Sequence, residues 1–383
     1  MSKTVAITGR DPATGLGIAI TIENGLIVAI APDDGAGHLY LSTGLIDLQV
    51  NGYGGIDLNS GDVTPARVLA LAEVMAGLGV TTFLPTLITA SEQSIILALK
   101  AIAEARKLYR LVEAMVPFVH VEGPSVSPAD GPRGAHPLAH VRAPSLEDFE
   151  RWQDASDGLV GLVTLAPEYA EAPAYIAALT ARNVHVALGH TAATSEQIHA
   201  AAEAGAALST HLGNGAASLL PRHPNFIWSQ LADDRLTATF IADGHHLPAD
   251  TFKAMLRAKG LEKSILVSDS VALAGMPPGI YEEAVGGRVE VSANGRIGVA
   301  GTPYLAGAGL PLCTNVAIAI DMAGLSLADG LTLATASPGR FTSGRGRLEV
   351  GARADIIRFG WAVGDQALTI ADTWVRGERI HPK

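Results

Sequence analysis

The chain has 383 residues, of which 48% are hydrophobic and 17% charged, so it can bury a large core and is not an intrinsically disordered protein. Its 27 Lys and Arg residues against 38 Asp and Glu give a net charge of −11, which excludes the basic surface that binds nucleic acid or an anionic membrane. The single cysteine, Cys313, excludes a disulfide framework and a cysteine-based zinc site. With no signal-peptide pattern after Met1, we expect a cytoplasmic protein.

Short β-branched runs bounded by turn residues open the chain, at 4–8, 17–21 and 26–30. Runs of the same kind return at 354–359 and 373–380. We expect the two ends of the chain to meet in one small β-domain, a β-sandwich made from residues 1–43 and 345–383.

Between the ends, short β-branched runs alternate with Ala-rich helical stretches, which is the pattern of repeated parallel βα units. Eight strand-like runs occur, at 45–50, 80–85, 115–121, 159–166, 184–189, 207–211, 237–243 and 265–269. Helical stretches between them include 65–78, 91–109, 173–183, 195–205 and 249–259. The pattern predicts an α/β fold, a (β/α)8 TIM barrel over residues 44–344, with a doubly wound sheet as the competing architecture.

Polar side chains stand at the C-terminal ends of several of these runs, where a barrel of this kind carries its active site. Glu122 and His190 directly follow the third and fifth runs, and His211 ends the sixth. One carboxylate and two imidazoles suit a catalytic divalent metal that keeps one position open for water. A single histidine of this kind would be interpreted as a strand cap, but three equivalent positions favour a metal. We predict one ion, zinc first, with iron, cobalt or manganese as alternatives.

Asp269 ends the last run and is predicted to be the general base that takes a proton from metal-bound water. Its alternative role is to cap the turn that follows. Asp243 precedes Gly244, and an Asp-Gly pair after a strand is also an ordinary turn signal, so two interpretations of Asp243 remain open.

His120 lies two residues before Glu122, so both side chains point to the same face of an extended strand. It is either a further metal ligand or a support for the carboxylate. Gln49 and Asn51 share one face at the end of the first run, and amides are poor zinc ligands. This pair therefore favours one metal over two.

Taken together, these segments resemble the N-acetylglucosamine-6-phosphate deacetylases of the amidohydrolase superfamily over nearly the whole chain. The resemblance is carried by the first strand at 44–52, His-x-Glu-Gly-Pro at 120–124, Gly-Ala-His at 134–136, Leu-Gly-His-Thr at 188–191, Thr-His-Leu-x-Asn at 210–214, Asp-Gly-x-His at 243–246 and Ser-Asp at 268–269. It implies a homodimeric, metal-dependent enzyme that converts N-acetylglucosamine-6-phosphate, a small acetylated amino sugar, to glucosamine-6-phosphate and acetate.

The resemblance also implies roles for individual residues. Glu122, His190 and His211 become the metal ligands, and Asp269 the catalytic acid and base. Arg222 reaches the sugar phosphate across the dimer interface, with an ordinary exposed loop Arg as the alternative. Apart from the resemblance, backbone N–H groups around Asn214 and Gly215 suit an anion. The substrate-binding residues are then His136, Asn214, Gly215, Arg222, His246 and Leu305, the last in a loop that closes the site.

The chain departs from the family pattern near the expected sugar pocket. Residues 213–216 read Gly-Asn-Gly-Ala where the family usually has Phe-Asn-Ala-Met, the segment 128–133 is longer, and Ala308 replaces a common Ser. These changes leave the metal chemistry alone but affect substrate choice. Two alternatives therefore stand beside the deacetylase: an amidohydrolase acting on another N-acyl or cyclic amide or on an unphosphorylated amino sugar, and a catalytically silent barrel used for binding.

Overall fold

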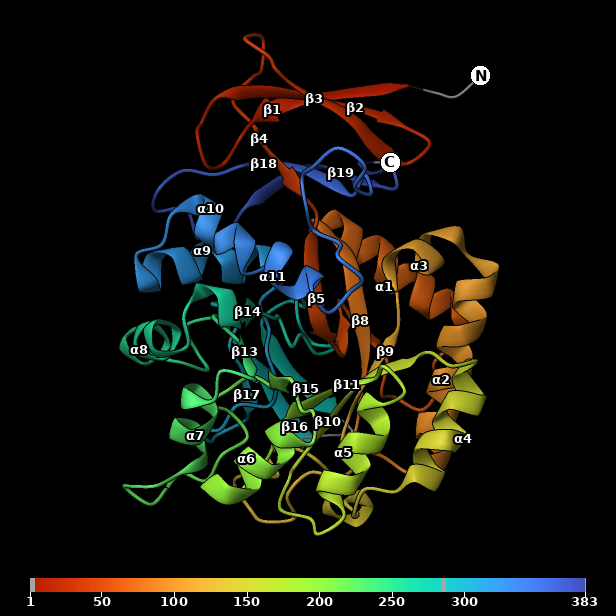
Figure 1. Cartoon of the computed structure of the whole chain (residues 1–383), viewed down its shortest axis with the longest axis vertical. Helices are drawn as coiled ribbons and strands as arrows, with labels where there is room; N and C mark the ends of the chain where they lie inside the picture. The colour runs from red at the N-terminus through yellow and green to blue at the C-terminus, as the bar shows by residue number, and fades with distance from the viewer. Residues whose placement is uncertain (1–3, 284–286, 383) are drawn as a thin grey trace.

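Both ends of the chain lie together in a small β-domain stacked on one end of a larger α/β barrel (Figure 1). The computed structural model describes residues 4–283 and 287–382. The barrel carries helices around its outside, and the described residues include no helix long and apolar enough to cross a membrane (Figure 1).

Eight strands form the barrel, each parallel to its neighbours, in the order β14-β13-β12-β11-β10-β9-β8-β5. A parallel bridge between Val50 and Ser270 joins the two ends of this sheet, so it closes into a barrel and is not a doubly wound sheet. The eight predicted runs are confirmed as β5 (Leu45–Val50), β8 (Val80–Ile88), β9 (Val119–Glu122), β10 (Val160–Leu165), β11 (His185–Leu188), β12 (Leu208–Ser209), β13 (Thr237–Phe240) and β14 (Ser264–Leu266).

Several strand boundaries differ from the predicted ones. The sixth, seventh and eighth runs were expected to reach residues 211, 243 and 269, but β12, β13 and β14 end at Ser209, Phe240 and Leu266. The third run was expected to begin at residue 115, but residues Arg110–Met115 form a short helix, α3. Its face with Val112 and Met115 is buried, and Pro117 disfavours helix at the residue before it, so β9 begins only at Val119.

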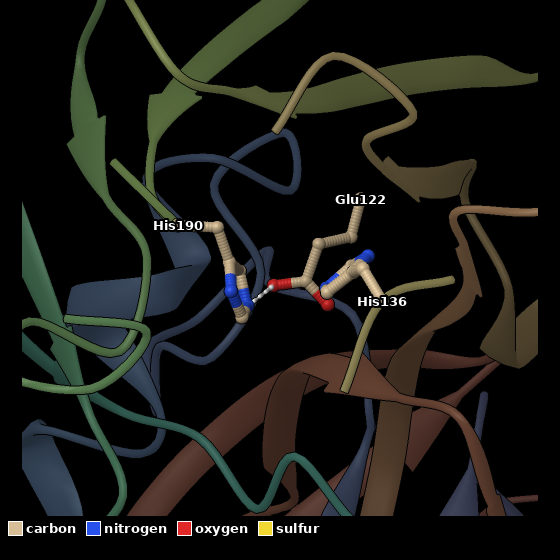
Figure 2. A group of neighbouring side chains, drawn as sticks. All are labelled: Glu122, His136 and His190. Atoms are coloured by element: carbon tan, nitrogen blue, oxygen red, sulfur yellow. Dashed lines mark ion pairs between the residues drawn. The ribbon is translucent and has the colours of Figure 1, made fainter. Parts of the chain in front are cut away.

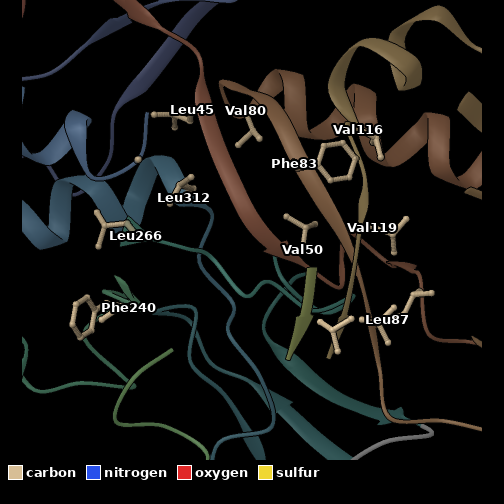
Figure 3. Packing of buried hydrophobic residues seen from close by; sticks show 14 of the residues in the cluster. Leu45, Val50, Val80, Phe83, Leu87, Val116, Val119, Phe240, Leu266 and Leu312 are labelled. Atoms are coloured by element: carbon tan, nitrogen blue, oxygen red, sulfur yellow. The ribbon is translucent and has the colours of Figure 1, made fainter. Parts of the chain in front are cut away.

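The helices pack their apolar faces on the outside of the strands. Buried residues of the strands and helices, among them Phe83, Val119 and Leu312, form the largest core cluster (Figure 3). The α-helices are α1 (Pro65–Gly77), α2 (Glu92–Leu108), α3, α4 (Leu146–Ser156), α5 (Ala172–Thr180), α6 (Ser195–Glu203), α7 (Phe226–Ala232), α8 (Ala249–Lys259), α9 (Leu312–Ala323), α10 (Leu327–Thr332) and α11 (Ala336–Gly339). The five predicted helical stretches are confirmed as α1, α2, α5, α6 and α8.

The terminal strands form one seven-stranded sheet in the order β20-β19-β18-β4-β1-β2-β3. They are β1 (Val5–Arg10), β2 (Gly17–Glu23), β3 (Leu26–Pro32), β4 (Tyr40–Thr43), β18 (Ile356–Gly360), β19 (Thr369–Val375) and β20 (Glu378–His381). The sheet curls around a core of its own that includes Ile20, Leu41 and Ile356. The curl brings β3 beside the segment that leads into β18, where Ile27 N donates to Ala352 O at 2.9 Å. The single run predicted at 373–380 is wrong: it splits at Arg376 and Gly377, whose φ angles of 50° and 74° make a turn.

Two small β insertions at the C-terminal ends of the barrel strands were not predicted. The hairpin of β6 (Gly52–Tyr53) and β7 (Ile56–Asp57) follows β5. A three-stranded sheet of β15 (Gly279–Glu283), β16 (Gly287–Val291) and β17 (Ile297–Val299) follows β14. Val289 and Ile297 of this sheet pack against Leu273, so the insertion covers the segment that continues from β14.

A buried carboxyl inside the barrel predicts a pH-dependent stability. Burial raises the pKa of Asp47 to about 7, although backbone N–H groups of Gln49 and Ser268 donate to its Oδ1 at 3.3 and 3.1 Å. Because the folded protein holds this proton more tightly than the unfolded chain does, Asp47 lowers the free energy of unfolding progressively as pH rises from about 4 to about 7. Asp47→Asn keeps the acceptor without the charge. The free energy of unfolding of Asp47→Asn should therefore exceed that of wild type by an amount that grows through this window, to about 4 kcal/mol above pH 7.

Urea unfolding of both proteins at about pH 5 and about pH 8 checks this expectation. Asp34→Asn, at an exposed position, is the control and should show no comparable change. A difference between Asp47→Asn and wild type that stays constant with pH would contradict the account.

Candidate active site

A cavity of about 310 Å³ opens at the C-terminal ends of the barrel strands. The sequence predicted ten site residues, and nine of them line this cavity: Glu122, His136, His190, His211, Asn214, Gly215, His246, Asp269 and Leu305. Arg222 is the exception, since it is exposed on the loop between β12 and α7 and is not part of the lining. The barrel therefore brings together residues that lie up to 183 positions apart in the chain (305 − 122).

Two imidazoles converge on one oxygen of Glu122. The Nε2 atoms of His190 and His211 lie 3.4 and 3.0 Å from Glu122 Oε1 (Figure 2 shows the first pair). His190 Nδ1 lies 2.9 Å from Pro132 O, and since a carbonyl only accepts, Nδ1 carries the proton and Nε2 presents its lone pair to the cavity. A histidine oriented through its other nitrogen in this way is typical of a metal ligand.

His136 lies beside the same carboxylate. Ligand atoms of Glu122, His136 and His190 all lie within 4.8 Å of one another, so this group is also suited to hold a metal ion (Figure 2). His136 Nδ1 is 2.7 Å from Thr89 Oγ1, and its ring stacks edge-on against that of His190 at 4.3 Å. Glu122 and His190 belong to both possible ligand sets, and the third ligand is His211 in the predicted set or His136 in this one.

The backbone at three of these residues adopts a strained conformation. His190, His211 and Asp269 have φ angles of 50°, 27° and 52°, a left-handed region that non-glycine residues rarely occupy. Such strain persists where surrounding structure enforces it, and it concentrates at functional sites. Gly215 fits this crowding, because a Cβ there would lie 2.7 Å from His190 Nδ1.

Local contacts shift the pKa values of two cavity carboxyls, Glu122 and Asp269, in opposite directions. Burial alone would raise the pKa of Glu122, but its hydrogen bonds to His190 and His211 hold that pKa well below the usual range. Burial, with repulsion from Glu122, raises the pKa of Asp269 to about 6. Asn51 Nδ2 donates to Asp269 Oδ1 at 2.8 Å, which holds the carboxyl at the end of the strand.

The structure also answers the two questions that the sequence left open. Asp243 Oδ2 lies 2.7 Å from His246 Nδ1, and Oδ1 accepts from the backbone N–H of His246 at 2.9 Å, so this Asp both shapes the turn and orients the histidine. His120 has both ring nitrogens engaged, with Nδ1 3.2 Å from Leu48 O and Nε2 2.8 Å from Thr164 Oγ1. His120 therefore lies outside the cavity lining, supports the strand that carries Glu122, and has no free ring nitrogen to bind an ion.

Sequence reasoning missed part of the cavity wall. Asp57 and Asn59 reach the cavity from the hairpin after β5, and Val289 reaches it from β16. The one sequence feature that could have indicated this hairpin is the Gly54-Gly55 pair, which marks a tight turn after the first barrel strand. Within the part of the chain that the structure describes, no Lys or Arg lines the cavity.

The amino-acid sequence is similar to sequences of known proteins. Residues 40–380 match the model of the Amidohydrolase family. The chain is 32% identical to an N-acetylgalactosamine-6-phosphate deacetylase of Escherichia coli O157:H7, over 94% of this chain and 93% of that protein. It is 34% identical to an N-acetylglucosamine-6-phosphate deacetylase of Bos taurus, over 90% and 84%.

A solved structure resembles this chain along almost its full length. It is a mutant of N-acetyl-D-glucosamine-6-phosphate deacetylase from Mycobacterium smegmatis, in complex with N-acetyl-D-glucosamine-6-phosphate. The TM-score is 0.86 at 28% identity, and the match covers 99% of both chains. The barrel and the sheet made from both termini are thus found together in that enzyme.

Proposed function

Because this chain belongs to the amidohydrolase family, we propose that it removes the acetyl group from an N-acetylated amino sugar phosphate. N-acetylglucosamine-6-phosphate is the first candidate, and the products are glucosamine-6-phosphate and acetate. The observation that carries the proposal is the convergence of Glu122, His190 and His211 in one cavity with Asp269. Relatives that carry this activity by name support it.

In the proposed reaction, Glu122, His190 and His211 hold one divalent cation, zinc in the first instance. The ligand atoms that meet at Glu122 Oε1 fit such an ion, since one carboxylate and two imidazoles are a common catalytic zinc set. When bound, the cation supplies a Lewis acid for the amide carbonyl and lowers the pKa of a water molecule.

The chain's own residues supply the remaining steps. Asp269, held at Oδ1 by Asn51, takes the proton from water and returns it to the leaving nitrogen. His246, oriented through Nδ1 by Asp243, presents Nε2 to the cavity and binds the sugar or the acetyl oxygen. His136, whose pKa burial lowers to about 3, stays neutral and also binds the substrate in the cavity.

Phosphate binding needs a cation that the cavity itself does not provide. We assign this role to Arg222, reaching the cavity of a second subunit in a homodimer, because Arg222 is exposed and its loop continues from the cavity residues Asn214 and Gly215. Arg222→Ala should raise KM for the phosphorylated sugar about 10- to 100-fold, since a charged hydrogen bond contributes roughly 1.5–3 kcal/mol. The KM for the unphosphorylated sugar should not change.

Steady-state kinetics on both sugars check this prediction. Arg257→Ala, at another exposed position, is the matched control and should leave both KM values as in wild type. If Arg222→Ala leaves KM for the phosphorylated sugar unchanged, Arg222 is not the phosphate-binding residue.

A second candidate substrate is N-acetylgalactosamine-6-phosphate, favoured by the relative from Escherichia coli O157:H7. The short side chains of Gly213, Gly215 and Ala216, at the place where the family has bulkier residues, support a sugar pocket with different specificity. The metal identity and a cytoplasmic location, the latter suggested by the lone buried Cys313, belong to the same proposal.

The test combines metal analysis of the purified protein with an acetate-release assay. The panel contains the 6-phosphates of N-acetylglucosamine and N-acetylgalactosamine, plain N-acetylglucosamine and an N-acetyl amino acid. We expect about one divalent ion per chain and the largest kcat/KM on one of the two phosphorylated sugars. Preference for the N-acetyl amino acid, or no acetate release from any of them by metal-loaded protein, would overturn the proposed substrate class.

A further inference from the structure

We propose that a hydrogen-bonded chain of His120, Thr164 and Thr210 inside the barrel positions Glu122 and His211 for metal binding. The three residues are 1%, 0% and 4% exposed. His120 precedes Glu122 by two residues on β9, and Thr210 directly precedes His211 at the end of β12. Thr164, on β10, joins them. This inference rests on the metal site proposed above.

The direction of each hydrogen bond in this series of three residues can be worked out from the His120 end. His120 Nδ1 lies 3.2 Å from Leu48 O and 3.4 Å from Thr86 Oγ1, whose own hydroxyl donates to a backbone carbonyl at 3.1 Å. Both neighbours therefore accept, and Nδ1 carries a proton. The ring is buried with no carboxylate hydrogen-bonded to it in the described chain, so it is neutral and its Nε2 accepts.

The two hydroxyls are then fixed in turn. Thr164 Oγ1, 2.8 Å from His120 Nε2, must donate to that nitrogen. Its only proton is used there, so Thr210 Oγ1, 2.7 Å away, donates to Thr164. No member can turn away without leaving a buried polar group unpaired, which is costly in a barrel interior.

This series of hydrogen bonds connects β9 and β12, the strands whose C-terminal ends lead to the proposed ligands Glu122 and His211. It runs from Leu48 on β5 through β9 and β10 to the end of β12. Glu122 Oε1 and His211 Nε2 meet at 3.0 Å directly beyond it. His120 and Thr164 are thus positioning residues, since they act on the metal site through their neighbours and do not line the cavity.

The test compares two substitutions at one residue. Thr164→Val keeps the side-chain shape but removes the donor, and Thr164→Ser restores it. Zn²⁺ affinity of the metal-free proteins is measured by competition with a chromophoric chelator. We expect Thr164→Val to bind Zn²⁺ about 10-fold more weakly, the lower end of the range for direct partners of metal ligands, because Thr164 acts through His120 and Thr210. Thr164→Ser should bind close to wild type. At saturating zinc, kcat of the Val variant should fall while KM stays near wild type.

Thr81→Val is the matched control, because Thr81 is also buried in the barrel wall and its hydroxyl has no hydrogen-bond partner in the described chain. It should bind Zn²⁺ like wild type. Unchanged zinc affinity in Thr164→Val, even with a lower melting temperature, would overturn the positioning role, and so would an equal loss in Thr81→Val. Wild-type protein that takes up no zinc would instead overturn the metal site itself, and the inference with it.

Discussion

Asp269→Asn is expected to lower kcat for acetate release by a factor on the order of 10²–10⁴ while the metal content stays that of wild type. Asp269 lines the cavity with Glu122 and is held through Oδ1 by Asn51, so Oδ2 is left to accept a proton. An asparagine has nearly the same size but cannot take a proton from water. The measurement is single-turnover acetate release together with metal analysis of both proteins.

Asp57→Asn serves as the control, because Asp57 is another carboxyl in the same cavity and reaches it from the hairpin after β5. It removes a negative charge without touching the Asp269–Asn51 contact, so its kcat should fall far less. If the two variants lose activity equally, the effect reflects cavity charge and Asp269 is not the base. Retained turnover in Asp269→Asn would remove the assignment outright.

Glu122→Gln is expected to abolish both metal binding and turnover. Glu122 Oε1 is the point at which the Nε2 atoms of His190 and His211 meet, and Gln supplies no charge there to attract a cation. A ligand that binds only the folded state stabilises it by RT ln(1 + [L]/Kd), which is about 2.7 kcal/mol at a hundredfold excess over Kd. The melting temperature of wild type should therefore rise as Zn²⁺ is added to metal-free protein, and that of Glu122→Gln should not.

Removal of the metal from wild type by a chelator should stop acetate release, and added Zn²⁺ should restore it. Glu150→Gln, which removes a carboxylate from an exposed ion pair with Arg182, should keep the full zinc response and the activity. A zinc-dependent rise in the melting temperature of Glu122→Gln equal to that of wild type would show that the ion binds elsewhere. The prediction would then be wrong.

Local sequence patterns predict the barrel and the main residues that line its cavity. Both depend on local patterns: β-branched runs alternating with Ala-rich stretches specify βα units, and a polar residue that directly follows a strand must lie at the rim. This is why Glu122, His190, His211 and Asp269 could be named together although they are scattered along the chain. The side chains brought in by the small β insertions left no such pattern.

The contacts between individual atoms of the site could not be predicted from the sequence. The partners of His120 lie 72 and 44 positions away, at Leu48 and Thr164, and no local spacing encodes contacts across a barrel interior. The same holds for the approach of His136 to Glu122 and for the absence of Arg222 from the cavity wall of its own chain. These contacts depend on how the closed sheet aligns its strands, and that alignment is set by packing of the whole core, beyond the reach of any short segment.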